Sequence, residues 1–352
     1  MSARDILFLR ADASSAIGVG HVMRCLALAQ AWEDAGGEAV FACAELPPAL
    51  AERLQRESIR VVAIAAPVAS AEDIILTVRA AREADAAWIV VDGYCFAPEY
   101  YAALRAEGFR VLALDDMAHL SSYPVDALLN QNLSATPHSY AGKISPDTEL
   151  LLGPRHSLLR REFRVAQTIQ RSHRGGLRRV LVSFGGADTE NFTGRILENL
   201  FRSVRRDFQV VVLAGPANPH VAALRALAAS APVACEVRVG VENVAVVMAF
   251  ADVAITAGGS TVWELASMRL PALIGASEDN QLAGLAALQA VPFFRARRIE
   301  DLLAGDLVAE TDALLAQSVS AHAADFDAEG AVRVVTHLHT LAARRALEPV
   351  SA

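Results

Sequence analysis

The chain has 352 residues, 53% of them hydrophobic, with a mean hydropathy of +0.31 and a formal net charge of −8. This composition argues against a disordered chain, and the acidic balance argues against a general nucleic-acid-binding protein. The length is too great for one compact core, so we expect two domains. No apolar run reaches the roughly 18 residues of a membrane-spanning helix, and the first residues lack signal-peptide features. We therefore expect a cytoplasmic protein without membrane insertion.

Metal-ligand and disulfide patterns are missing from the sequence. The four cysteines are scattered without CxxC spacing, which predicts buried free thiols instead of a disulfide framework or a zinc site. His337 and His339 lie in a helical pattern that directs them to different faces of a helix. We expect neither a metal nor a cofactor.

Short apolar runs alternate with helical patterns through the first half of the chain. The runs lie at residues 5–10, 38–44, 59–66, 86–94 and 110–116. Helical patterns such as residues 21–37 and 48–58 separate them, and this alternation is typical of βαβ units with a parallel sheet. The nearly continuous apolar strands predict a sheet covered on both faces. Residues 1–170 are therefore expected to form an N-terminal Rossmann-like domain.

The alternation restarts after a basic, glycine-containing stretch, Arg171–Arg179, which we interpret as the interdomain linker. Helices are expected to begin near Asn191 and Ser260, and strands are expected at residues 178–186, 207–215, 234–239, 253–259 and 271–275. Residues 180–352 are expected to form the second domain. The final helix, at about residues 330–346, could pack on either domain. The predicted fold class is α/β, with two doubly wound domains that present the loops at their strand carboxyl ends to a cleft.

Two glycine turns in the second domain are candidate phosphate sites. Gly258 and Gly259 follow an apolar strand and precede the helix that opens at Ser260, and Gly185-Gly186 follow another strand. Backbone N–H groups and the helix dipole at such turns bind phosphate. The alternative is that the glycines serve only the geometry of the turn. Asp188 is expected to cap the helix that follows the Gly185-Gly186 turn.

Glu264 has two possible roles. Thr261 and Glu264 have the spacing of a capping box, in which the glutamate only accepts a hydrogen bond from the start of its helix. Alternatively, its carboxylate accepts both hydroxyls of a ribose. Asn280 and Gln281 follow the next strand and reach the same edge, although polar residues before a helix are also ordinary N-cap residues.

His21 directly follows a Gly-x-Gly turn, Gly18–Gly20, and opens an amphipathic helix at the carboxyl end of the first strand. The positive end of the helix dipole disfavours a protonated ring, so a neutral imidazole able to act as a general base is expected. The alternative is a histidine that only caps its turn. Arg24, one helical turn later, is expected either to hold an anionic or carbonyl-bearing substrate or to be solvated.

Polar residues also follow the other predicted strands of the first domain. Their position favours contact with substrate, although carboxylates after strands also cap helices. The candidates are Asp12, Asp92 and Tyr94, followed by Asp115, Asp116, Asn130 and Asn132.

Taken in order, the motifs of both halves are similar to those of a known family. They are RADASSAIGVGHVMRCLALA, VVDGY, LDD, LLNQN, LLGPRHSLLRREF, VSFGGAD, AGGSTVWELASMRLPAL and DNQ. The chain resembles the UDP-2,4-diacetamido-2,4,6-trideoxy-β-L-altropyranose hydrolases of pseudaminic acid biosynthesis, and the related spore-coat polysaccharide proteins, over nearly its whole length. The C-terminal motifs are shared more widely with GT-B glycosyltransferases of the MurG type.

The resemblance implies a GT-B fold in which the C-terminal domain holds UDP and the N-terminal domain faces the sugar. It implies that His21 is the catalytic base, that Glu264 binds the ribose, and that Gly259 and Ser260 lie at the diphosphate. Asn280 and Gln281 would line the site near the nucleotide or sugar. The chain departs from the family at Thr189, where relatives often carry proline, and at His156, where they often carry tyrosine.

A nucleotide diphosphate is already a good leaving group, so one base that activates water is sufficient for hydrolysis. Attack opposite UDP predicts inversion at the anomeric carbon. The expected partner is a UDP-sugar, and we expect a monomer. Alternatives are an inverting GT-B glycosyltransferase, a UDP-sugar 2-epimerase and a non-catalytic nucleotide-sugar-binding protein.

Overall fold

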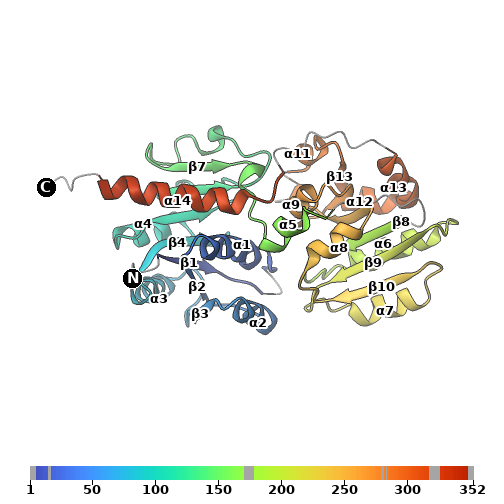
Figure 1. The fold of residues 1–352 in the computed structure, drawn as a ribbon, viewed down its shortest axis with the longest axis horizontal. Helices are drawn as coiled ribbons and strands as arrows, with labels where there is room; N and C mark the ends of the chain where they lie inside the picture. The colour runs from blue at the N-terminus through green and yellow to red at the C-terminus, as the bar shows by residue number, and fades with distance from the viewer. Residues whose placement is uncertain are drawn as a thin grey trace. The chain divides into compact units, whose positions relative to one another are not determined.

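The computed structural model describes residues 5–14, 17–169, 178–278, 281–282, 284–316 and 326–347. For residues 345–347 it describes the backbone alone. The chain forms two compact units. Unit 1 comprises Met1–Arg161 and Ala328–Ala352, and unit 2 comprises Glu162–Asp327 (Figure 1). Unit 1 thus ends before the expected boundary at residue 170. The expected linker lies mostly outside the described residues, and its last two residues, Arg178 and Arg179, begin a strand.

Unit 1 is built on a seven-stranded parallel sheet with the order β3-β2-β1-β4-β5-β6-β7. Its strands are β1 Ile6–Ala11, β2 Glu38–Cys43, β3 Arg60–Ala63, β4 Ala86–Asp92, β5 Val111–Leu114, β6 Ala127–Asn130 and β7 Glu149–Leu152. The order places β1 beside β4, so the chain reverses its direction of progress across the sheet at this point. Ligands of doubly wound sheets bind at such a switch point, beyond the strand carboxyl ends.

Helices cover both faces of this sheet because the strands are apolar on both sides. Leu7 and Leu9 of β1 share a core with α1 (Gly20–Asp34) and α14 (Gly330–Leu347). Phe8, between them, points to the opposite core, which contains residues of α3 (Ala71–Glu83) and α4 (Pro98–Ala106). The remaining described helices of unit 1 are α2 Pro48–Arg56 and the 3₁₀ helices η1 Pro137–Tyr140 and η2 Pro154–His156. α5 Arg161–Ala166 begins at the last residue before the boundary, and its other residues belong to unit 2.

Unit 2 has a six-stranded parallel sheet with the order β10-β9-β8-β11-β12-β13. Its strands are β8 Arg178–Ser183, β9 Phe208–Ala214, β10 Cys235–Val239, β11 Val253–Ala257, β12 Ala272–Ala276 and β13 Phe294–Arg298. Its described helices are α6 Phe192–Arg202, α7 Val221–Ala229, α8 Val244–Phe250, α9 Thr261–Ser267, α11 Leu285–Gln289, α12 Ile299–Ala304 and α13 Leu307–Leu315. None of the helices in the described part of the chain is long and apolar enough to cross a membrane.

A buried arginine links β1 to α3 in unit 1. Arg10 is fully buried, and its Nε and Nη2 donate to the two carboxylate oxygens of Asp73 at 3.0 and 2.6 Å. Burial alone would raise the pKa of Asp73, but the hydrogen bond and charge of Arg10 lower it below its ordinary value. A depressed pKa in the folded state stabilises the protein above the ordinary pKa, and this contribution is lost as the pH falls.

We therefore expect Asp73→Asn to lower the free energy of unfolding by about 3 kcal/mol at pH 7, because it removes one of the two carboxylates that pair with the buried Arg10 and leaves only Asp12. The difference from the parent protein should shrink as the pH falls from about 5 to 3. Urea unfolding in a Trp263→Phe background measures this, since the two remaining tryptophans, Trp32 and Trp88, are buried in unit 1. Asp147→Asn, at an exposed site, is the control. A difference that does not change with pH would contradict the assignment.

The last helix packs on unit 1, which answers the question that the sequence left open. α14 lies against α1 (Figure 1), and its first residue, Gly330, presses on the backbone of η2. A Cβ at Gly330 would lie 2.2 Å from the carbonyl oxygen of Ser157, which is shorter than any contact between two atoms that are not bonded to each other. We expect Gly330→Ala to lower the free energy of unfolding by about 1–3 kcal/mol, measured by urea unfolding in the same background. Asp147→Asn, at an exposed site of unit 1, is again the control; an equal effect of both would overturn this explanation.

Candidate active site

His21 pairs with Asp92 at the carboxyl edge of the unit 1 sheet. α1 begins at Gly20, after β1, and Asp92 is the last residue of the neighbouring strand β4. His21 Nδ1 lies 2.7 Å from Asp92 Oδ1, and the two residues are 71 positions apart in sequence. The alternative of a histidine that only caps its own turn is therefore wrong. The N-cap of α1 is Val19, and no side chain caps this helix.

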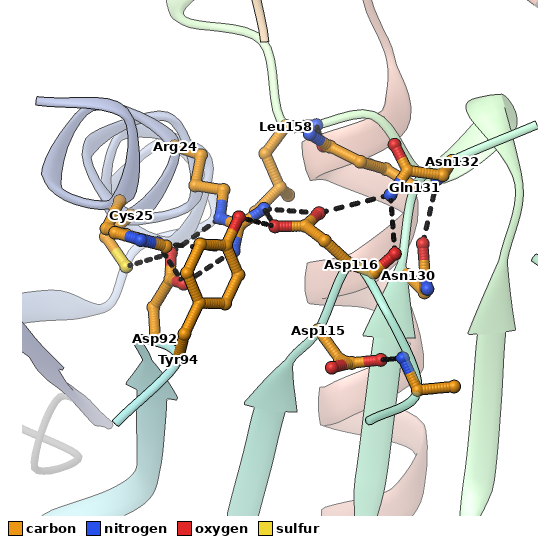
Figure 2. Close-up of polar contacts among 12 residues, drawn as sticks. Arg24, Cys25, Asp92, Tyr94, Asp115, Asp116, Asn130, Gln131, Asn132 and Leu158 are labelled. Carbon is orange, nitrogen blue, oxygen red and sulfur yellow. Dashed lines mark hydrogen bonds and ion pairs between the residues drawn. The ribbon is translucent and has the colours of Figure 1, made fainter. Parts of the chain in front are cut away.

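The surroundings of Asp92 fix which nitrogen of His21 carries a proton. Asp92 is 1% exposed, and Arg24 donates to it from Nε and from Nη2, each at 2.6 Å (Figure 2). Burial alone would raise the pKa of Asp92, but the charge of Arg24 and the contact with His21 lower it well below its usual range. An ionised carboxylate only accepts hydrogen bonds, so Nδ1 of His21 donates and Nε2 of the neutral ring keeps its lone pair.

Arg24 joins two carboxylates. In addition to its contacts with Asp92, its Nη1 donates to both oxygens of Asp116 at 2.9 Å. Burial alone would lower the pKa of Arg24, but Asp116 and Asp92 raise it well above its ordinary value, so its charge is permanent. The residue is 7% exposed, and besides these two carboxylates its Nη2 lies 3.4 Å from Nδ1 of His21. Its expected contact with substrate remains a prediction, whereas its contacts with carboxylates are observed.

Tyr94 is the exposed member of this group. Its hydroxyl donates to Asp116 Oδ2 at 2.8 Å, and its ring meets that of His21 edge-on, with the centroids 4.9 Å apart. The residue is 39% exposed, whereas His21 is 7% exposed. The structure thus brings together five of the candidate residues of unit 1, His21, Arg24, Asp92, Tyr94 and Asp116, and Tyr94 is the most exposed of them.

Asp116, Asn130 and Asn132 are candidates from the sequence on the same ground as Asp92, their position at strand ends. Asp116 follows β5, and Asn132 Nδ2 donates to its Oδ1 at 3.3 Å and to its backbone oxygen at 3.2 Å (Figure 2). Asn130 Oδ1 in turn accepts from the backbone N–H of Asn132 at 3.0 Å. Asp115 belongs to a separate buried group, because its carboxylate accepts from the hydroxyls of Tyr123 and Tyr140. The only sequence signal for Asp116 was its position at a strand end.

Asp12 has a different environment. Its Oδ2 accepts from Arg10 Nη1 at 2.6 Å, and its Oδ1 accepts from the backbone N–H groups of Ala44 and Glu45 at 2.7 and 3.0 Å. These bonds hold the chain just after β2. The structure therefore gives Asp12 a structural role, and its expected contact with substrate remains a prediction.

The glycines before α1 form a compact loop. Gly18 has a φ of +80°, which favours glycine, and its N–H donates to the carbonyl oxygen of Ser14 at 2.8 Å. A Cβ at Gly18 would meet nothing within 4 Å, so open space lies beside it. Gly20 is the first residue of α1, next to His21. The residue directly before the histidine therefore has no side chain of its own.

The first glycine turn of unit 2 is tightly built. Gly185 has a φ of +81°, and a Cβ at Gly215 would lie 2.1 Å from the carbonyl oxygen of Gly186, so the two loops touch through backbone. Asp188 accepts from the backbone N–H groups of Phe192 and Thr193 at 2.8 and 3.0 Å, but the N-cap of α6 is Asn191, whose Oδ1 accepts from the N–H of Gly194 at 3.3 Å. Asp188 therefore satisfies two N–H groups of the first turn without being the N-cap residue. Close packing accounts for the glycine at 215, the positive φ favours the glycine at 185, and a phosphate role for this turn remains a prediction.

The second glycine turn is joined to the loop after β12. Gln281 Oε1 accepts from the backbone N–H groups of Gly258 and Ser277, each at 3.2 Å. A Cβ at Gly258 would press on Gln281 at 3.1 Å, whereas one at Gly259 would meet nothing within 4 Å. Gln281 therefore shapes the turn that the sequence assigned to the nucleotide. The other predicted residue of this loop, Asn280, lies outside the described residues.

Glu264 lies in the first turn of α9 and is half-buried. The N-cap of this helix is Ser260, one residue before the expected Thr261, and its side chain makes no capping hydrogen bond. With Ser260 as N-cap, the third helical position is Trp263, so Thr261 and Glu264 do not have the positions of a capping box. The ribose role of Glu264 and the diphosphate role of Ser260 remain predictions.

His156, one of the two departures from the family pattern, lies in η2. Its Nδ1 is 3.0 Å from the carbonyl oxygen of Leu152, and its ring centroid is 5.9 Å from that of His337 in α14. Among the described residues, no group of three or more His, Cys, Asp or Glu side chains is arranged to hold a metal ion.

Comparisons with known proteins bear first on the fold. No family model matches the chain. The chain is similar to MurG of Acinetobacter baumannii, with a TM-score of 0.63 and 16% identity over 96% of this chain and 99% of MurG. It is also similar to S. aureus MnaA, solved with UDP, with a TM-score of 0.63 and 15% identity over 96% of each chain. The chain has the GT-B fold.

A curated relative is similar in sequence. It is the UDP-2,4-diacetamido-2,4,6-trideoxy-β-L-altropyranose hydrolase of Campylobacter jejuni, 26% identical over 196 residues. The match covers 55% of this chain and 65% of the relative, so the chain spans less than two thirds of that protein's length.

Proposed function

We propose that the protein hydrolyses a UDP-linked diacetamido-trideoxy-hexose, UDP-2,4-diacetamido-2,4,6-trideoxy-β-L-altropyranose, in the biosynthesis of pseudaminic acid. The observation that carries this proposal is the His21–Asp92 pair at the carboxyl edge of β4, with Nδ1 of His21 committed to a carboxylate. The curated relative from Campylobacter jejuni supports the choice of substrate. The similarity to GT-B structures, one of them solved with UDP, supports the choice of nucleotide.

In the proposed reaction, Nε2 of His21 takes a proton from water while the water oxygen forms a bond to the anomeric carbon. The bond between that carbon and the diphosphate oxygen breaks, and its electron pair leaves with UDP. Attack from the side opposite UDP inverts the anomeric centre. The buried carboxylate of Asp92 holds the ring in the required tautomer and stabilises the imidazolium as it forms.

We assign the nucleotide to unit 2. The backbone N–H groups of the Gly185–Gly186 and Gly258–Ser260 turns are proposed to meet the charge that develops on the departing diphosphate. That of Gly258 already donates to Gln281 Oε1. Glu264 is proposed to accept the ribose hydroxyls, and Asn280 and Gln281 to lie near the nucleotide or sugar. In unit 1, Gly18, Gly20 and Tyr94 are proposed to face the sugar, with Arg24 and Asp92 behind His21.

The test is to incubate the purified protein with this UDP-sugar alone, in the presence of EDTA, and to follow free UDP and the anomeric proton signals of the product by NMR. Release of UDP with formation of the inverted free sugar is the expected result. UDP release only after addition of an acceptor would instead establish the glycosyltransferase alternative. Binding of the substrate without turnover, with or without an acceptor, would indicate a nucleotide-sugar-binding protein.

A further inference from the structure

The carboxylate of Asp116 is connected to His21 through two buried groups. Asp116 binds Nη1 of Arg24 through both oxygens, Arg24 binds Asp92 through Nε and Nη2, and Asp92 binds Nδ1 of His21. The side chains of Arg24, Asp92 and Asp116 are 7%, 0% and 13% exposed. Because water is largely excluded, charges in this group interact more strongly than they would at the surface.

The balance of charge in this group depends on Asp116. Arg24 alone would neutralise Asp92 and leave His21 facing a pair without net charge. Asp116 adds a second carboxylate, so the three groups together carry one negative charge. When His21 takes a proton in the proposed reaction, the imidazolium faces this negative charge, which stabilises it.

Asp116 is also held rigidly. Besides Arg24, it accepts from the hydroxyl of Tyr94 at 2.8 Å and from Nδ2 of Asn132 at 3.3 Å, so residues from three separate segments fix its orientation. A guanidinium that binds two carboxylates through opposite sides of its planar fork has little freedom to rotate. By fixing the Arg24 guanidinium, Asp116 also fixes the carboxylate of Asp92 and, through it, the orientation of the imidazole.

Few other charged or titratable groups face His21 in the described part of the chain. From its own helix these are Arg24 and Cys25, whose Sγ donates to Asp92 at 3.6 Å. Burial raises the pKa of this thiol well above its ordinary value, so the thiol carries no charge. From β4 and the loop after it they are Asp92 and Tyr94, and His119 stands behind the Tyr94 ring, with ring centroids 6.4 Å apart. Asp116 is thus the second carboxylate of the group.

We infer that Asp116 is a positioning residue for His21, which acts through Arg24 and Asp92 and sets the pH range in which the imidazole accepts a proton. This inference rests on the proposed function for its catalytic consequence. Its electrostatic content, the coupling between Asp116 and His21, does not depend on the identity of the substrate.

The decisive variant is Asp116→Asn, which removes the charge and keeps the shape. We expect the acidic limb of the pH dependence of kcat to move to lower pH by roughly one unit. The plateau value of kcat should fall about tenfold because the base is weaker, with KM nearly unchanged. Asp116→Glu retains the charge and should return the limb to its original position. Asp126→Asn is the matched control, since Asp126 is also buried and paired with an arginine, Arg105, but precedes β6 at the opposite edge of the sheet.

A second readout separates this inference from the proposed function. The ¹⁵N NMR titration of His21 should show its midpoint moved to lower pH in Asp116→Asn, with or without any turnover. Arg24→Lys keeps the charges but loses the fork, so kcat should fall while the midpoint stays in place. If Asp116→Asn folds and the midpoint of the His21 titration does not move, the inference is overturned. If Asp116→Asn does not fold, an unchanged kcat in Arg24→Lys overturns it instead. A moved midpoint without hydrolysis by the parent protein leaves the inference standing and rejects the proposed reaction.

Discussion

Replacing His21 with alanine is expected to lower the rate of UDP release by about 10³-fold, because no other group in the described cluster combines a lone pair at neutral pH with this position. Binding of UDP should persist, since the nucleotide is assigned to unit 2. The measurements are single-turnover UDP release and isothermal titration with UDP. Together they separate a loss of chemistry from a loss of affinity.

The control for this variant is His138→Ala, which removes an exposed histidine of η1 and should leave the rate unchanged. Release of UDP by His21→Ala at the parental rate would exclude His21 as the base. A parallel loss of UDP affinity would show that the substitution disturbs more than the chemical step.

Asp92→Asn is expected to lower kcat by about 10²- to 10⁴-fold, although the substitution is nearly isosteric. The amide can donate a hydrogen bond to Nδ1 of His21, which would place the ring proton on Nε2 and remove the lone pair that the reaction needs. The variant also takes away the counterion that stabilises the imidazolium. ¹⁵N NMR of the ring reports the tautomer directly, and steady-state kinetics give kcat and KM.

The same substitution at Asp126 again provides the comparison, because it also removes a buried carboxylate paired with arginine. If kcat falls equally in Asp92→Asn and Asp126→Asn, the loss reflects general destabilisation of unit 1. A proton retained on Nδ1 in Asp92→Asn would likewise contradict the orienting role of this carboxylate.

Most of the fold was predictable because its strands are apolar on both faces and alternate with helices. The strand at Phe294–Arg298 was not predicted, since its sequence FRARR carries three arginines and it pairs only with β12 at the sheet edge. The short strands β6 and β7 likewise gave little signal. Hydrophobic periodicity identifies buried strands well and polar edge strands poorly.

The candidate site was predictable in part, for a topological reason. The strands β1 and β4 are neighbours in the sheet. His21 and Arg24 follow β1, and Asp92 and Tyr94 lie at or just after the end of β4. The rule that ligands bind beyond strand carboxyl ends therefore predicted that these residues share one site. The same rule assigned Asp12 to the substrate, because nothing in the sequence showed that Arg10, inside an apolar strand, is buried beside it. The pairing of Arg24 with Asp116, 92 residues away, also depends on tertiary contacts that no local pattern encodes.

The position of α14 has a consequence for how the chain is made. Ala331, Val334, Val335 and Leu338 belong to the same core as α1, yet almost the entire sequence separates the two helices. On the ribosome, the part of α1 that packs on α14 stays uncovered until the last segment of the chain emerges. A nascent chain halted after unit 2 therefore presents an exposed hydrophobic surface of the kind that chaperones bind. A stop codon before residue 330 should yield aggregated protein instead of a soluble, inactive one.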